Sequence, residues 1–117
     1  MITVSLNGAV TDFINGTSMV ENPSCPDEKA FADHWGNRTE RTYGRGYRAT
    51  LTAPAWVFNW IADFVEPLLK SGMEATPQER NGARELRTTL TREGVRKADY
   101  DGPTALELEA AGYLPTP

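Results

Sequence analysis

The segment that most constrains this fold is residues 53–70, "APAWVFNWIADFVEPLLK", because it predicts a helix that water cannot surround. Large apolar residues cover most of the helical circumference and leave one narrow polar stripe, formed by Asn59, Asp63, Glu66 and Lys70. Thr52 is the expected N-cap, Pro54 is tolerated in the first turn, and Pro67 is expected to kink or shorten the last turn. Such a helix must be covered on several sides, either by the rest of the chain or by a partner.

Two interpretations of this helix follow. It is either the central core helix, laid on a sheet and flanked by helices predicted at 77–93 and 103–111, or part of its surface meets a second molecule. Aromatic side chains are typical anchors of protein interfaces, so the candidate partner-binding residues are Trp56, Phe58 and Trp60. A homodimer is the simplest way to cover the helix, since symmetric dimers are the commonest soluble oligomers.

The N-terminal part reads as strands followed by a short helix. The stretch "MITVSLNGAV" alternates apolar and polar residues, which predicts a strand with one buried face. Asn15-Gly16 predicts a hairpin turn between short strands at Phe13-Ile14 and Met19-Val20. The following segment predicts a helix that ends at Gly36, with Phe31 and Trp35 on one face.

Residues 39–52 are β-like, and "RTYGRGYR" at 41–48 allows two structures. In one long strand, Tyr43, Arg45 and Tyr47 share a face. Alternatively, Gly44-Arg45-Gly46 turns a hairpin, because glycine tolerates the positive φ of tight turns.

Two further helices are expected in the C-terminal part. "TPQE" places Thr76 at the N-cap and Glu79 at N3, a capping box that begins a helix over 77–93 ended by Gly94. A last helix is expected over 103–111, and residues 113–117 are expected to be loose. The sequence therefore predicts one α+β domain over 1–117, in which an antiparallel sheet of three or four strands packs against a C-terminal group of about three helices.

Charge and cysteine content limit the possible functions. The net charge is −4, yet residues 38–52 hold four arginines against one glutamate, and residues 76–97 hold six basic against three acidic residues. The single cysteine, Cys25, excludes an intramolecular disulfide, and the N-terminus does not read as a signal peptide, so we expect a cytoplasmic protein. Residues 53–70 are too short and too interrupted to span a membrane.

Catalytic and metal sites find little support. Cys25, His34 and Asp33 are the only candidates for nucleophilic catalysis, and their spacing follows no nucleophile motif. A metal site would have to combine His34 with Asp27, Glu28 or Asp33. We therefore predict no enzyme activity, no metal and no cofactor.

Nucleic-acid binding is the alternative function. Arginines and tyrosines on an exposed strand resemble a base-stacking platform, and a basic helix edge could extend it. The residues concerned are Arg41, Tyr43, Arg45, Tyr47 and Arg48, together with Arg80, Arg84 and Arg87.

Residue choice suggests an origin. Nine arginines stand against three lysines, with thirteen alanines, thirteen threonines, ten glycines and eight prolines, as in proteins from GC-rich genomes. In this composition and in its strand-then-apolar-helix layout, the chain resembles small accessory proteins of actinobacteria and their phages, without a shared motif. The predicted function is non-catalytic binding of a protein partner, in the manner of a phage-encoded protein that acts on a host protein.

Overall fold

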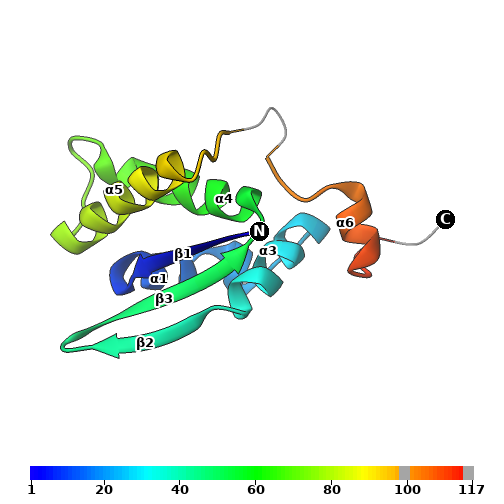
Figure 1. Cartoon of the computed structure of the whole chain (residues 1–117), viewed down its shortest axis with the longest axis horizontal. Coiled ribbons are helices and arrows are strands. Elements are labelled where there is room, and N and C mark those ends of the chain that lie inside the picture. The colour runs from blue at the N-terminus through cyan, green and yellow to red at the C-terminus, as the bar shows by residue number, and fades with distance from the viewer. Residues whose placement is uncertain (98–100, 115–117) are drawn as a thin grey trace.

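The computed structural model describes residues 1–97 and 101–114 and shows an α+β fold, as the sequence predicts (Figure 1). Six α-helices and one 3₁₀ turn accompany a three-stranded antiparallel sheet in the described part of the chain. The elements are β1 (Ile2–Asn7), α1 (Gly8–Asn15), α2 (Ser18–Glu21), α3 (Pro26–Gly36), β2 (Thr39–Tyr43), β3 (Gly46–Ala53), α4 (Ala55–Val65), the 3₁₀ turn η1 (Glu66–Leu69), α5 (Pro77–Arg92) and α6 (Ala105–Ala110).

The sheet has the strand order β1-β3-β2 and one buried face. Val4 pairs with Leu51 and Leu6 with Ala49, and all four side chains are buried. Thr3 pairs with Thr52 on the other face, where their hydroxyl oxygens lie 2.7 Å apart. The period of two in the N-terminal sequence therefore correctly marks β1 as a half-buried strand.

Residues 8–15 and 18–21 form the helices α1 and α2, so the hairpin predicted at Asn15-Gly16 is wrong. The Asn7 side chain accepts a hydrogen bond from the Val10 amide and so caps α1, while Val10 and Ile14, four residues apart, face the core. Gly16 has a φ of −81° and is the C-cap of α1, so it does not adopt the left-handed conformation of a hairpin turn. Burial of one helical face outweighs the local turn signal here.

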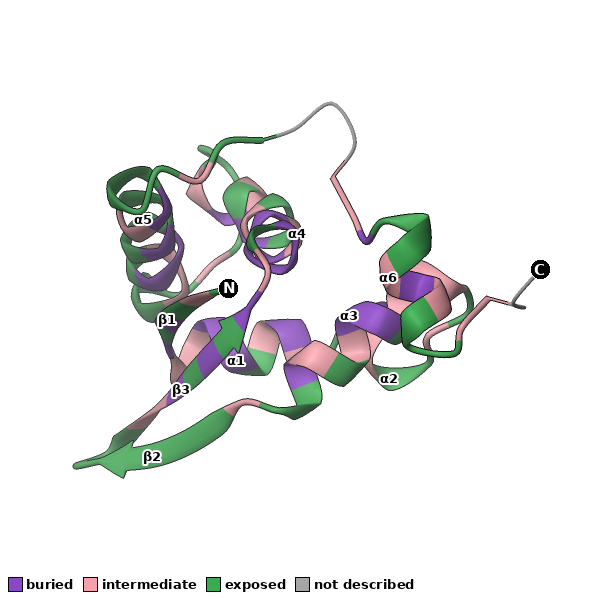
Figure 2. Cartoon of the chain, turned by 45° about the vertical axis from the view of Figure 1, so that its right-hand side comes forward, coloured by how far each residue is buried: buried purple, intermediate pink, exposed green. Residues whose placement is uncertain are grey.

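Residues 39–53 form a hairpin, so the continuous strand is the wrong one of the two alternatives. Tyr43 pairs with Gly46 across a two-residue turn, in which Gly44 has a φ of 57°. Positive φ at the first central position alone is the pattern of a type II′ turn. The strands project beyond the helices, and every residue of β2 is exposed (Figure 2).

The turn geometry predicts different tolerance at its two glycines. We expect Gly44→Val to destabilise the protein by about 1–3 kcal/mol, because a β-branched residue is strained at positive φ. Gly46→Ala should be nearly neutral, since Gly46 has no positive φ and nothing lies within 4 Å of an added Cβ. Arg45→Ala should also leave the thermal midpoint unchanged. Equal effects of the two glycine substitutions would show that the turn is built differently.

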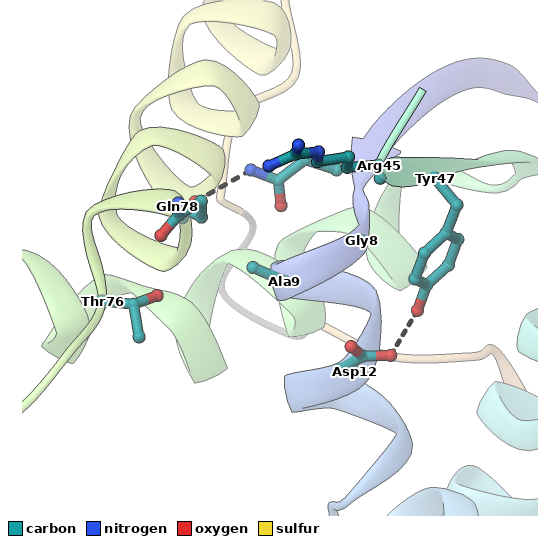
Figure 3. Close-up of a pocket in the computed structure, with 9 residues that line it drawn as sticks. Gly8, Ala9, Asp12, Arg45, Tyr47, Thr76 and Gln78 are labelled. Atoms are coloured by element: carbon teal, nitrogen blue, oxygen red, sulfur yellow. Dashed lines mark hydrogen bonds between the residues drawn. The ribbon is translucent and has the colours of Figure 1, made fainter. Parts of the chain in front are cut away.

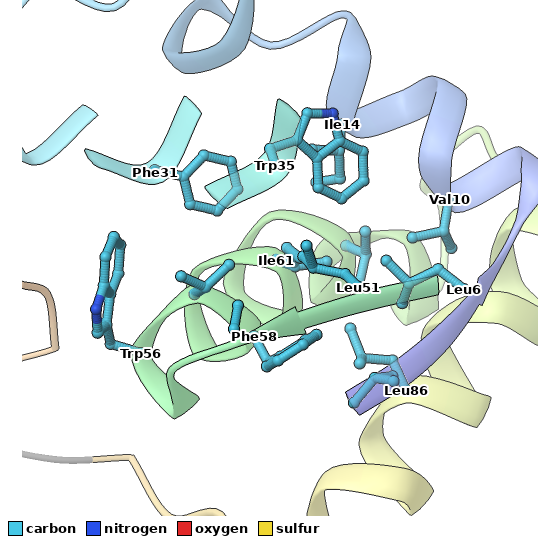
Figure 4. Close-up of a cluster of buried hydrophobic side chains, with 14 of the residues drawn as sticks. Leu6, Val10, Ile14, Phe31, Trp35, Leu51, Trp56, Phe58, Ile61 and Leu86 are labelled. Atoms are coloured by element: carbon cyan, nitrogen blue, oxygen red, sulfur yellow. The ribbon is translucent and has the colours of Figure 1, made fainter. Parts of the chain in front are cut away.

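Helix α4 is covered mainly by its own chain, as the core interpretation requires. Helices α1 and α5 pack against it, and Figure 4 shows its side chains meeting those of β1, β3, α1 and α3. Phe58 has no exposed surface. Two details differ from expectation, because Thr52 belongs to β3 and Pro54 stands at the N-cap position. The α-helix ends at Val65 and is followed by η1, which contains Pro67. This is consistent with a shortened last turn.

Helices α5 and α6 both begin with capping boxes. Thr76 accepts from the Glu79 amide at 3.1 Å, and the Glu79 carboxylate accepts from the Thr76 amide at 2.9 Å, as predicted. Gly94 follows α5 with a φ of 71°. Helix α6 starts at Ala105 rather than Pro103, because Thr104 forms a second capping box.

The segments around these helices complete the described structure. Tyr113 and Leu114 pack against the core, unlike the loose end predicted for 113–117, of which 115–117 lie outside the described residues. Among the helices that the structure describes, none is long and apolar enough to cross a bilayer.

The cap of α5 gives a direct test of this helix. Thr76→Ala removes one half of the capping box, and we expect it to lower the free energy of unfolding by about 0.5–2 kcal/mol in urea denaturation. Thr88→Ala, at an exposed position within the same helix, is the matched control and should cost nothing. An unchanged midpoint for Thr76→Ala would show that the cap does not stabilise α5.

Candidate functional site

The hairpin divides its aromatic and basic residues between two faces, so no single stacking platform forms. Arg41 and Tyr43 lie on the open face of the sheet, with the Arg41 guanidinium 5.8 Å from the centre of the Tyr43 ring. Tyr43 is 55% exposed. Tyr47 pairs with Thr42 and points to the opposite face, and Arg45 lies in the turn. The straight row of rings and guanidinium groups that the alternative function needs is therefore absent from the described hairpin.

Tyr47 instead closes a pocket of about 420 Å³ between the hairpin, the start of α1 and the start of α5. Its hydroxyl donates a hydrogen bond to the Asp12 carboxylate. Figure 3 shows this bond on one side of the pocket and Thr76 and Gln78 on the other. Desolvation, followed by the hydrogen bond to Asp12, raises the pKa of Tyr47 to about 12. The pair therefore fixes the hairpin to α1.

The raised pKa predicts a pH dependence of stability. Because the folded protein holds the Tyr47 proton more tightly than the unfolded chain, this contribution is complete below pH 10 and is lost as the pH rises from about 10 to 12. We expect Tyr47→Phe to be less stable than the wild type by roughly 1 kcal/mol at neutral pH, with the difference shrinking above pH 10. Thermal midpoints of both proteins across this range measure it. A constant difference up to pH 12 would contradict the prediction.

Each of the remaining candidate arginines contacts its own acceptor within the protein. Arg48 bonds Ser5 at 2.8 Å and also pairs with Glu85 of α5. The three candidate arginines on α5 also have acceptors within the protein. Arg87 pairs with Glu66. Arg80 donates to the Met73 carbonyl at 2.7 Å, and Arg84 donates to the Asn81 side chain at 3.0 Å. Thus the two basic segments of the sequence do not merge into one unpaired basic surface.

The aromatic candidates on α4 differ in burial. Phe58 is enclosed in the core and offers no atom to a partner, which corrects its assignment as a contact residue. Trp56 is also buried and donates from its indole nitrogen to Glu107 at 3.4 Å. Trp60 donates to the Asp101 carbonyl at 2.5 Å and stacks on Phe31, yet it stays half-buried and lines a groove.

This groove, of about 390 Å³, lies where α2 and the start of α3 approach the end of α4. We call it the acidic groove. Its apolar side chains are Phe64, which is 42% exposed, the half-buried Trp60 and, beneath them, Met19, which is only 3% exposed. Its lining is completed by Ser18, Cys25, Asp27, Glu28 and Asp63. The groove thus combines an apolar surface with three carboxylates.

Two of these carboxylates have defined hydrogen-bond partners. Glu28 accepts hydrogen bonds from the amide and hydroxyl of Ser24, at 3.0 and 3.1 Å, and neither donor carries a charge. The Asp63 carboxylate accepts from Lys97 at 2.9 and 3.0 Å, and this hydrogen bond raises the pKa of Lys97. Lys97 thus pairs with Asp63, the donors to Glu28 are uncharged, and three acidic side chains line the groove.

The candidate catalytic residues Cys25 and His34 do not lie close together. Cys25 precedes the first turn of α3 and His34 lies in its last turn, so their backbones are about 13 Å apart along the helix. His34 instead packs edge-on against Trp56, and its Nε2 lies 4.0 Å from Glu107. In residues 1–97 and 101–114, no group of three or more His, Cys, Asp or Glu side chains could hold a metal ion.

Comparison of the chain with protein-family models, with curated proteins and with solved structures finds no match. The chain's own geometry therefore carries any functional assignment.

Sequence reasoning missed most of the acidic groove. Phe64 follows Trp60 by four residues, so the helical pattern places both on one face of α4. The pattern does not reveal that this face meets α2, because residues 18–21 read as a strand.

Proposed function

We propose that this protein is a non-catalytic protein-binding module, and that its partner docks in the acidic groove. The observation that carries the proposal is the exposure of Phe64 beside Trp60 and Met19 in a concave surface rimmed by carboxylates. An apolar centre with a charged rim is the usual anatomy of a protein interface, and buried aromatic residues supply most of its affinity.

The chemistry of the groove specifies the partner. A bound segment should carry a large apolar side chain for the surface formed by Trp60 and Phe64. It should also carry lysine or arginine for Asp27, Glu28 and Asp63, since opposite charges on the two partners favour encounter and register. A protein segment that combines both features is the ligand that the groove fits best.

Nucleic acid fits the observations less well. The chain is acidic overall, and the first turn of α3, which borders the groove, is acidic as well. Phosphate contacts require cations, and the three candidate arginines on α5, Arg80, Arg84 and Arg87, each donate to an acceptor within the protein. Binding of RNA or DNA is therefore an outcome that the test below must exclude.

The test is an unbiased selection from a random peptide library displayed on phage. We expect selected peptides to combine an aromatic or leucine residue with lysine or arginine, and to bind more weakly as salt increases. Phe64→Asp should weaken binding of a selected peptide about tenfold or more, because it places a charge at the centre of the apolar surface.

Matched controls define the site. Leu106→Asp makes the same kind of change at another exposed apolar side chain, 75% exposed on α6 and outside the groove, and should leave binding unchanged. Equal loss in both variants, or no dependence on Phe64, would contradict docking in the groove. Binding of single-stranded RNA or DNA that falls steeply with salt would favour the alternative function.

A further inference from the structure

The hairpin tip has the chemistry that the acidic groove requires of a partner. Tyr43 is the most exposed aromatic side chain described, and the guanidinium of Arg41 lies over its ring. Among the described residues, neither Arg41 nor Arg45 forms an ion pair. The tip therefore presents one aromatic ring and two cations without counter-charges.

The same molecule cannot bring these two surfaces together. The hairpin is fixed in the sheet because β3 pairs with both β1 and β2, and its tip projects away from α2 and α3 (Figure 2). The acidic groove also shares no lining residue with the pocket beside Tyr47, which includes Arg45 of the hairpin tip. Contact between tip and groove must therefore join two molecules.

We infer that the hairpin tip of one copy docks in the acidic groove of a second copy, with Tyr43 on the apolar surface and Arg41 and Arg45 opposite the carboxylates. The inference rests on the proposed function of the groove. The groove, at about 390 Å³, is large enough for an aromatic ring together with part of an arginine side chain.

This contact is heterologous, because it joins two different patches of the same chain. Repetition of a heterologous contact gives either an open chain of molecules or a closed ring. The smallest ring is a reciprocal dimer, in which each hairpin occupies the other groove. A single tip is a small interface, so we expect weak association in the micromolar range.

The experiment separates the two surfaces by mutation and then mixes them. Arg41→Glu/Arg45→Glu removes the hairpin cations and keeps the groove, whereas Phe64→Asp damages the groove and keeps the hairpin. Sedimentation velocity over about a hundredfold dilution series should show that the wild type self-associates. We expect each variant alone to associate at least tenfold more weakly.

The decisive result comes from the mixture of the two variants, because each supplies the surface that the other lacks. The mixture should form a one-to-one complex, in which the hairpin of the Phe64→Asp variant occupies the groove of the arginine variant. Its affinity should be about that of a single hairpin–groove contact in the wild type. Arg84→Glu reverses an exposed arginine outside both surfaces and should associate as the wild type does. Circular dichroism confirms that each variant is folded.

Three outcomes would overturn the inference. A wild type that stays monomeric throughout the series excludes self-docking, and so does self-association that both variants retain. Variants that lose association and do not recover in the mixture indicate one symmetric interface instead. Peptide binding to the groove is measured separately, so a monomeric wild type that still binds selected peptides would leave the proposed function standing.

Discussion

We expect Trp35→Ala to lower the free energy of unfolding by about 3–5 kcal/mol, a large part of the stability of a domain of this size. Trp35 is only 1% exposed and stacks on Phe31, with ring centres 6.3 Å apart. Its indole nitrogen also donates to the Asn15 side chain at 2.8 Å, which joins α3 to the end of α1. The substitution therefore opens a cavity and leaves a half-buried amide without its donor.

Urea denaturation followed by circular dichroism measures this effect without relying on tryptophan fluorescence. Trp35→Phe is the matched variant, since it keeps an aromatic ring in the core but loses the second ring of the indole and the hydrogen bond to Asn15. We expect it to cost about 1–2 kcal/mol. A loss below about 1 kcal/mol for Trp35→Ala would show that α3 is not anchored through this ring.

The second large effect is expected at Gly82, where α5 crosses the start of α1. A Cβ added at Gly82 would overlap the Val10 side chain and the side-chain amide of Asn7, which caps α1 and donates to the Gln78 carbonyl. Alanine normally stabilises a helix interior by about 1 kcal/mol relative to glycine. Here we expect the opposite, a destabilisation of about 1–3 kcal/mol for Gly82→Ala, and more for Gly82→Val.

Gly36 provides the control for Gly82. It lies at the end of α3, has no positive φ, and has nothing within 4 Å of an added Cβ. Gly36→Ala should therefore be neutral or slightly stabilising. If thermal midpoints of Gly82→Ala and Gly36→Ala shift in the same direction, the close approach of α1 and α5 is not what requires glycine.

Local signals predicted those parts of the fold in which one short stretch determines its own conformation. The capping box at Thr76 needs only four residues, and the structure contains it as predicted. The alternation in β1 and the apolar pattern of α4 are likewise local, and both elements are present. The α+β class follows from these elements.

Where two local signals compete, the sequence alone did not decide between them. Asn15-Gly16 is a strong turn signal, but Asn7 as an N-cap and the i, i+4 pair Val10 and Ile14 favour a helix. Tertiary burial selects the helix, because both apolar residues then reach the core formed with α4 and α5. Gly82 shows the same limit, since its role depends on a neighbour about 70 residues earlier in the chain.

The sequence indicated that aromatic residues of α4 take part in binding, but it did not identify which of them are exposed. Sequence reasoning correctly placed Trp60 on a helix with excess apolar surface, but it could not tell that Phe58 faces inward while Phe64 stays exposed. That difference depends on which helices cover α4. The sequence also left open whether the two tyrosines of the hairpin share a face. The two-residue turn puts Tyr43 and Tyr47 on opposite faces of the sheet.

The most direct test of the docking groove is amide chemical-shift mapping of the ¹⁵N-labelled full chain during titration with a selected peptide. Docking in the acidic groove predicts that the largest shifts fall on the ends of α2, α3 and α4 that line it, at Met19, Glu28, Asp63 and Phe64. Amides of the central strand β3, such as that of Thr50, lie outside the groove and should remain unchanged. Shifts confined to the hairpin or to α5, with the groove unaffected, would contradict the account.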